Sequence, residues 1–99
     1  MYGTVARVQV RPGMESQLVE QFRAFEAARV PGFIVEYLYR MDSESNIYYI
    51  AAVFESKAAY FANANDPAQD ARYQRVRALL EADPQWHDGE IVFPSNPVI

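Results

Sequence analysis

The stretch that decides the fold is residues 46–67, NIYYIAAVFESKAAYFANANDP. It opens with eight apolar or aromatic residues, 47–54, and an uninterrupted run of this length predicts a strand that is covered on both faces. Ser56 then stands where a helix cap is expected, so a short helix is predicted over about 56–63. Asp66 and Pro67 supply a second cap with proline in the first helical position. One buried strand followed by two helices is the prediction for this stretch.

The length of the chain limits how that strand can be buried. A chain of 99 residues is expected to form a single domain over 1–99. A domain of this size has enough residues for one core but not for two. Its own helices can cover one face of the strand, and the other face then needs a second copy of the chain. The sequence therefore predicts a symmetric homodimer that packs through its sheet faces.

The rest of the chain fits the same plan. Alternating apolar residues predict strands over 2–11 and 33–41, and an apolar stripe at helical spacing predicts a helix over 14–29. The helix that starts at 67 is predicted to end near 82, and the last strand is placed at about 90–93. The order β-α-β-β-α-α-β is typical of a ferredoxin-like α+β fold, in which helices cover one face of a four-stranded antiparallel sheet.

A period of two assigns the side chains of the strands to faces. Thr4, Ala6, Val8 and Val10 are predicted to point toward the helices. In the strand over 33–41, the odd-numbered residues are assigned to one face and Ile34, Glu36, Leu38 and Arg40 to the other. The face turned away from the helices is predicted to hold the second set, together with Val5, Arg7, Gln9, Tyr49, Ala51 and Val53.

This bare face is too apolar to remain wet, so it is the predicted dimer surface. Glu36 is expected to pair there with Arg7 or Arg40, and the extended tail over 94–99 is expected to reach the partner.

Composition excludes several classes of function. The formal charge is −4, and the nine Lys and Arg residues are scattered, which argues against a nucleic-acid partner. The absence of cysteine excludes disulfides, thiolate catalysis and cysteine-held metal centres. The first residues lack the order of a signal peptide, and no apolar run is long enough to cross a bilayer. A cytoplasmic protein without a membrane partner is expected.

Few motifs point to chemistry. His87 is the single histidine, which leaves no catalytic triad and no two-histidine metal set, so no metal site is predicted. The four glycines are isolated and form no phosphate-binding loop. The seven tyrosines and six phenylalanines either fill the core or line a pocket under the helices. Arg72 is the arginine best placed near the mouth of such a pocket, where it would stabilise negative charge.

Four segments together resemble a known group of proteins. They are VQVRPGME at 8–15, PGF at 31–33, AVFESKAAY at 52–60 and PQWHDGE at 84–90. In this order and spacing they are similar to the dimeric α+β barrel superfamily, and specifically to antibiotic biosynthesis monooxygenase-like domains. The resemblance implies a pocket between helices and sheet in which the substrate itself supplies the electrons to oxygen, so no cofactor is expected.

The resemblance also implies which residues form the site. Tyr60 matches the aromatic residue of the short helix, and it is predicted to be catalytic together with Tyr39 and Arg72. Phe54 stands where these enzymes often carry tryptophan, and Ile50 where a polar amide is usual. The remaining residues expected to line the pocket are Ala6, Tyr37, Tyr48, Asn63 and Tyr73.

The function implied is that of a cofactor-independent monooxygenase-like protein that binds a small aromatic or apolar metabolite. The alternative is a dimer without catalytic activity that binds a ligand or has a stress-related structural role. Haem binding or degradation is the least favoured. The superfamily includes haem-degrading monooxygenases, which the resemblance associates with an asparagine, a tryptophan and a histidine at the positions where this chain has Ala6, Asn63 and Tyr73. The sequence alone leaves open whether the protein is an enzyme and what its substrate is.

Overall fold

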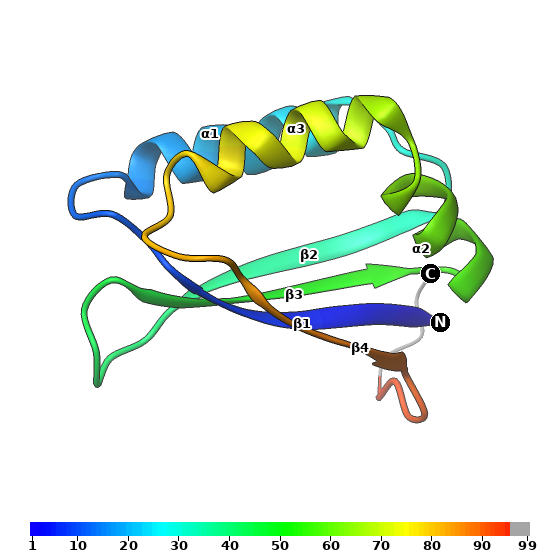
Figure 1. The fold of residues 1–99 in the computed structure, drawn as a ribbon. Coiled ribbons are helices and arrows are strands. Elements are labelled where there is room, and N and C mark those ends of the chain that lie inside the picture. The colour runs from blue at the N-terminus through cyan, green and yellow to red at the C-terminus, as the bar shows by residue number, and fades with distance from the viewer. Residues whose placement is uncertain (96–99) are drawn as a thin grey trace.

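The computed structural model describes residues 1–95 of the chain. The elements follow the order β-α-β-β-α-α-β along the sequence (Figure 1). Their bounds are β1 Tyr2–Gln9, α1 Glu15–Ala27, β2 Phe33–Arg40, β3 Ile47–Phe54, α2 Lys57–Ala64, α3 Pro67–Arg77 and β4 Gln85–Glu90.

The four strands form one antiparallel sheet in the order β2-β3-β1-β4. Helices α1 and α3 lie side by side over one face of this sheet, and α2 closes one end of the layer (Figure 1). No helix of the described residues covers the opposite face, which is called the open face below. The predicted ferredoxin-like α+β fold is confirmed.

The face assignment for β1 is also confirmed. Thr4, Ala6, Val8 and Val10 are buried on the helix side, whereas Val5 is 48% exposed on the open face. β1 is shorter than predicted, because after Gln9 only an isolated bridge between Val10 and Leu80 continues the pairing.

The face assignment for β2 was wrong, and a bulge explains why. Phe33 pairs with Phe54, but Val35 pairs with Val53, so the register shifts by one residue between them. A β-bulge inserts one residue and reverses the alternation that follows it. Glu36, Leu38 and Arg40 therefore share the helix side with their β3 partners, whereas Val35, Tyr37 and Tyr39 lie on the open face.

The caps predicted for α2 and α3 are present. The Ser56 hydroxyl accepts a hydrogen bond from the Ala59 N–H at 3.0 Å. The Asp66 carboxylate accepts one from the Ala68 N–H at 2.9 Å, with Pro67 beginning the helix. These bonds satisfy N–H groups that have no partner within a helix. α3 ends at Arg77 rather than near 82, because the N–H groups of Leu79 and Leu80 bond only three residues back and the Glu81 N–H bonds to the Gln9 carbonyl of β1.

The last strand was placed wrongly. It spans Gln85–Glu90 instead of 90–93, and Val92 and Phe93 lie beyond it with 90% and 79% of their surface exposed. The prediction followed apolar residues, but β4 is a polar edge strand that is held by backbone pairing to β1. Most of the predicted tail contact, residues 96–99, lies outside the described residues.

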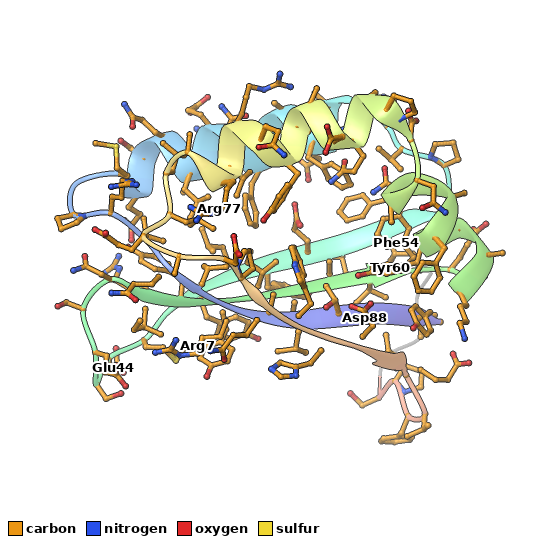
Figure 2. The ribbon with its side chains drawn as sticks, in the orientation of Figure 1. Arg7, Glu44, Phe54, Tyr60, Arg77 and Asp88 are labelled. Atoms are coloured by element: carbon orange, nitrogen blue, oxygen red, sulfur yellow. The ribbon has the colours of Figure 1, made fainter. Side chains whose placement is uncertain are left out.

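The expected ion pairs of Glu36 are replaced by others. Arg40 donates to Glu15 at 2.8 Å, and the Tyr48 hydroxyl donates to the same carboxylate at 2.6 Å, which fastens the start of α1 to the sheet. These two hydrogen bonds, first from Tyr48 and then from Arg40, lower the pKa of Glu15. Arg7 lies on the open face of the sheet, where its Nη2 is 4.0 Å from the Glu44 Oε2 (Figure 2).

Candidate functional site

A cavity of about 490 Å³ lies between the helices and the sheet, at the end where α2 packs. Its size falls in the range of small-molecule sites. Apolar and aromatic side chains dominate the lining, and a few polar groups interrupt it. The side chains of interest are Thr4, Phe25, Glu36, Ile50, Ala52, Phe54, Tyr60, Asn63, Arg72, Tyr73, Trp86 and Asp88.

The floor of the cavity is one row of residues that crosses all four strands. Glu36 pairs with Ala52, Ala52 pairs with Thr4, and Thr4 pairs with Asp88. Paired residues on neighbouring strands point to the same face, so all four side chains face the helices. The floor is therefore polar on both sides of the small side chain of Ala52.

Glu36 has an unusual environment within this row. In the part of the chain that the structure describes, no hydrogen bond or ion pair reaches its carboxyl group. Burial raises the pKa of Glu36 to about 7, with a smaller contribution from the negative charge of Glu26 on α1. At neutral pH this carboxyl group exists in both protonation states, as proton-transfer chemistry requires.

Two hydroxyl groups lie beyond Ala52, one on Thr4 of the floor and one on Tyr60 of α2. The Thr4 Oγ1 is buried and lies close enough to the Tyr60 hydroxyl to affect its pKa, but it makes no hydrogen bond of standard geometry among the described residues. Beside it, the Tyr60 hydroxyl donates to the Asp88 Oδ1 at 2.8 Å, across the gap between α2 and β4 (Figure 2). Burial, followed by this bond to Asp88, raises the pKa of Tyr60, so its phenol stays protonated at any physiological pH. A buried hydroxyl without a partner is costly unless a ligand or water bonds to it.

The roof supplies one positive charge. The Arg72 Nε donates to the Gln69 Oε1 at 2.9 Å, and its Nη2 lies 3.5 Å from the Asn63 Oδ1. The guanidinium also lies 5.5 Å from the centre of the Phe25 ring. No carboxylate pairs with Arg72 among residues 1–95, so neutral amide oxygens hold the side chain while its charge remains available to a ligand.

The predicted site residues divide into three groups. Six of them line the cavity, and these are Ile50, Phe54, Tyr60, Asn63, Arg72 and Tyr73. Ala6 and Tyr48 instead belong to the packed core: Ala6 lies between the cavity residues Ile50 and Trp86 on the neighbouring strands, and Tyr48 lies further along β3 toward the start of α1. Tyr37 and Tyr39, 55% and 53% exposed, lie on the open face, because the bulge at the start of β2 reverses the alternation. Tyr39 thus lies on the opposite side of the sheet from the cavity.

Sequence reasoning missed the polar floor. Glu36 was assigned to the open face, and Thr4 was treated as an ordinary member of the apolar face. Asp88 and Trp86 were not expected in the lining, since β4 was placed further along the chain. The single charge of Glu36 within the otherwise uncharged stretch 33–39 is the signal that could have singled it out.

No group of three or more His, Asp or Glu side chains in residues 1–95 is placed to hold a metal ion. No helix in the described part of the chain is long and apolar enough to span a membrane.

Comparison with known proteins identifies the family. A family model described as antibiotic biosynthesis monooxygenase matches residues 1–82. The match spans most of the chain, and the protein therefore belongs to the antibiotic biosynthesis monooxygenase family. No relative is found among curated protein sequences.

Solved structures share the fold at low sequence identity. A variant of SnoaB, a cofactor-independent oxygenase from Streptomyces nogalater, has a TM-score of 0.79 and 23% identity, and 95% of each chain is covered. A provisionally named antibiotic biosynthesis monooxygenase from Caulobacter crescentus has a TM-score of 0.79 and 21% identity, covering 93% of this chain and 90% of its own. A conserved protein from Methanosarcina mazei has a TM-score of 0.75 and 12% identity, with 89% of each chain covered. At these identities the likeness establishes the fold alone.

Proposed function

We propose that the protein is a cofactor-independent monooxygenase that oxidises a small, electron-rich aromatic compound inside the cavity. The observation that carries the proposal is the cavity itself, which combines aromatic walls with one arginine that has no carboxylate partner. Family membership and the name of the Streptomyces neighbour support the same class of reaction.

The chemistry needs only groups that the chain, the substrate and dioxygen supply. The substrate loses a proton and becomes an anion whose negative charge lies near Arg72. The anion passes electrons to dioxygen, and a carbon–oxygen bond forms at the ring. Loss of water then leaves a carbonyl, so that a ring CH₂ and O₂ give a ring C=O and H₂O. The apolar and aromatic walls would hold the ring of the substrate against the sheet.

The proposal is tested by oxygen uptake with anthrone, a tricyclic ketone whose ring CH₂ group is acidic enough to lose a proton in the first step. After dialysis against a chelator, the protein should consume one O₂ per anthrone and form anthraquinone, above the rate without protein. Absence of uptake with anthrone and with dihydroxynaphthalenes would contradict the proposal.

Arg72→Gln tests whether the guanidinium matters. The amide can still bond to neighbouring groups but carries no charge, so turnover should fall about tenfold to a hundredfold. Arg75→Gln is the matched control, because Arg75 lies on the same helix, is exposed, and does not line the cavity. Equal rates for the two variants would remove Arg72 from the proposed mechanism.

The assembly that we propose is a homodimer through the open face. Val5, Tyr37 and Tyr39 leave about half of their surfaces exposed there, which is a large apolar area for one face of a small domain. Sedimentation should give twice the chain mass of 11.3 kDa. A monomer at micromolar concentration would contradict this assembly.

A ligand-binding protein without activity is the second candidate. Ile50 and Phe54 favour it, because neither of these two wall residues can donate a hydrogen bond to a substrate. This candidate predicts that anthrone and naphthols bind in the cavity without being consumed.

A further inference from the structure

We infer that Glu36 is the group that removes the substrate's proton, so that the substrate enters as a neutral ring compound with a weakly acidic O–H or C–H. This inference rests on the proposed function and adds to it a proton acceptor and a substrate class.

The geometry of the floor provides the first argument. Glu36 and Thr4 flank Ala52 on the two neighbouring strands, each about 4.8 Å from the Ala52 strand. The methyl group of Ala52 leaves open space above it, which is part of the cavity. A planar ring that rests on Ala52 would have the Glu36 carboxylate at one edge. At its opposite edge would be Thr4, which also lines the cavity and whose buried hydroxyl lies beside that of Tyr60.

The other ionisable groups of the cavity are less suited to accept a proton. Asp88 already accepts the hydrogen bond from Tyr60, and the Tyr60 phenol keeps its own proton because its pKa is raised. Asp70 is exposed to solvent in the first turn of α3, at the rim of the cavity rather than on its floor. Among the carboxyl groups that line the cavity, Glu36 is left as the one that is partly buried and has no hydrogen bond or ion pair within residues 1–95.

The charges around Glu36 set the pH at which it acts. Glu26 on α1 is the negative charge that acts on it directly, and the raised pKa of about 7 comes first from burial and then from Glu26. The other charged or titratable groups that line the cavity are Asp70, Arg72 and Tyr73 on α3, Tyr60 on α2 and Asp88 on β4. A base whose pKa lies near the working pH is the most effective one for proton transfer.

The proton transfer defines the substrate class. The O–H or C–H bond of the substrate breaks, the proton moves to a carboxylate oxygen of Glu36, and the electron pair remains on the substrate. After the reaction with dioxygen, the proton leaves in the water that is formed, so Glu36 returns to its starting state. A substrate that is already anionic would be repelled by the Glu36 carboxylate, so a neutral phenol or ring ketone fits the site better than a carboxylic acid.

The test compares wild type with Glu36→Gln in oxygen uptake with anthrone from pH 5 to pH 9, after subtraction of the rate without protein. Wild-type kcat should rise about tenfold per pH unit below pH 7 and level off above it. The glutamine keeps the shape of the side chain but cannot accept the proton. Its kcat should therefore fall at least about a hundredfold and lose the inflexion, while KM changes little.

Glu26→Gln is the matched control. Glu26 is exposed and does not line the cavity, so the plateau rate at high pH should remain at the wild-type level. The inflexion should move to lower pH, because a negative charge near Glu36 has been removed.

The outcomes separate this inference from the function on which it rests. If wild type consumes oxygen and Glu36→Gln keeps both its rate and its inflexion, Glu36 is not the proton acceptor, and the oxygenase proposal still stands. If wild type consumes no oxygen with any of the probes, the proposed function fails, and the inference fails with it.

Discussion

The two ends of the layer between sheet and helices differ sharply, although the same four strands and two long helices build both. At one end, Leu18, Leu80, Val8 and Val10 are almost completely buried and leave no room for a ligand. At the other end, the row that contains Ala52 and Thr4 leaves a cavity of about 490 Å³. Large apolar side chains fill the first end, whereas the second end has the small Ala52 and the polar Thr4, and the bulge at the start of β2 adds Glu36 to them.

The comparison teaches that the stable part and the functional part of this small domain are separate. The end around Leu18 and Leu80, called the packed end below, gains its stability from apolar side chains in contact with one another. The end around Ala52 and Thr4, called the hollow end below, has fewer such contacts. It holds the partly buried carboxyl group of Glu36 and the buried hydroxyl of Thr4, and the burial of both groups is unfavourable for folding. The apolar contacts of the packed end offset this cost. Four changes test this division, beginning with the largest expected effect.

Leu18→Ala should weaken the packed end most. Leu18 is fully buried in α1 against the sheet, so its truncation leaves a void and should lower the free energy of unfolding by about 3 kcal/mol. Phe61→Ala at the hollow end is the comparison, because Phe61 is 38% exposed, and its loss should cost about 1 kcal/mol. Urea unfolding measures both, and equal costs would argue against two distinct ends.

Glu36→Gln should stabilise the protein at alkaline pH. The pKa of Glu36 is raised to about 7, so between the ordinary carboxyl pKa of about 4.3 and pH 7 the folded state binds more protons than the unfolded state. The stability of wild type therefore falls as pH rises through this window, and the variant does not share this loss. Relative to pH 4, the variant should gain up to about 3 kcal/mol over wild type at pH 8. Parallel urea curves at the two pH values would show that Glu36 is not perturbed.

Ala52→Leu should fill the hollow end. The larger side chain would occupy the space over the centre of the floor, so the affinity for a naphthol should fall at least about tenfold, or about 1.4 kcal/mol. Stability should change by less, because the leucine enters existing space rather than a packed core. Ala71→Leu on the exposed side of α3 is the control and should bind as wild type does. Calorimetry measures both affinities, and an unchanged affinity for Ala52→Leu would place the ligand elsewhere.

Tyr60→Phe should have the smallest effect on stability. It removes the hydrogen bond to Asp88 but keeps the ring among Tyr2, Phe54 and Phe61, so the free energy of unfolding should fall by about 1 kcal/mol. Tyr39→Phe on the open face makes no such bond in the described chain and should have no comparable cost. A loss equal for both variants would show that the bond to Asp88 contributes nothing.

Much of the fold could be predicted from local patterns. The apolar run of β3, the alternation of β1 and the caps at Ser56 and Asp66 are each short-range signals, and each appears in the structure where it was expected. The candidate site was harder to predict. Ile50, Phe54 and Tyr60 were expected in the lining, but Glu36 and Asp88 were not, because each depends on how a strand pairs.

The sequence by itself determined the order of the elements, the class of fold and the helix caps, because periodicity, capping and turn chemistry act over a few residues. Tertiary structure alone decided which side of the sheet Glu36 and Tyr39 occupy, because one bulged residue at the start of β2 reverses the alternation and leaves no mark in composition. It also decided that a polar edge strand brings Asp88 next to Thr4, because backbone pairing with β1 holds β4 in place whatever side chains it carries. The row from Glu36 to Asp88 exists only when four segments far apart in the chain come into register.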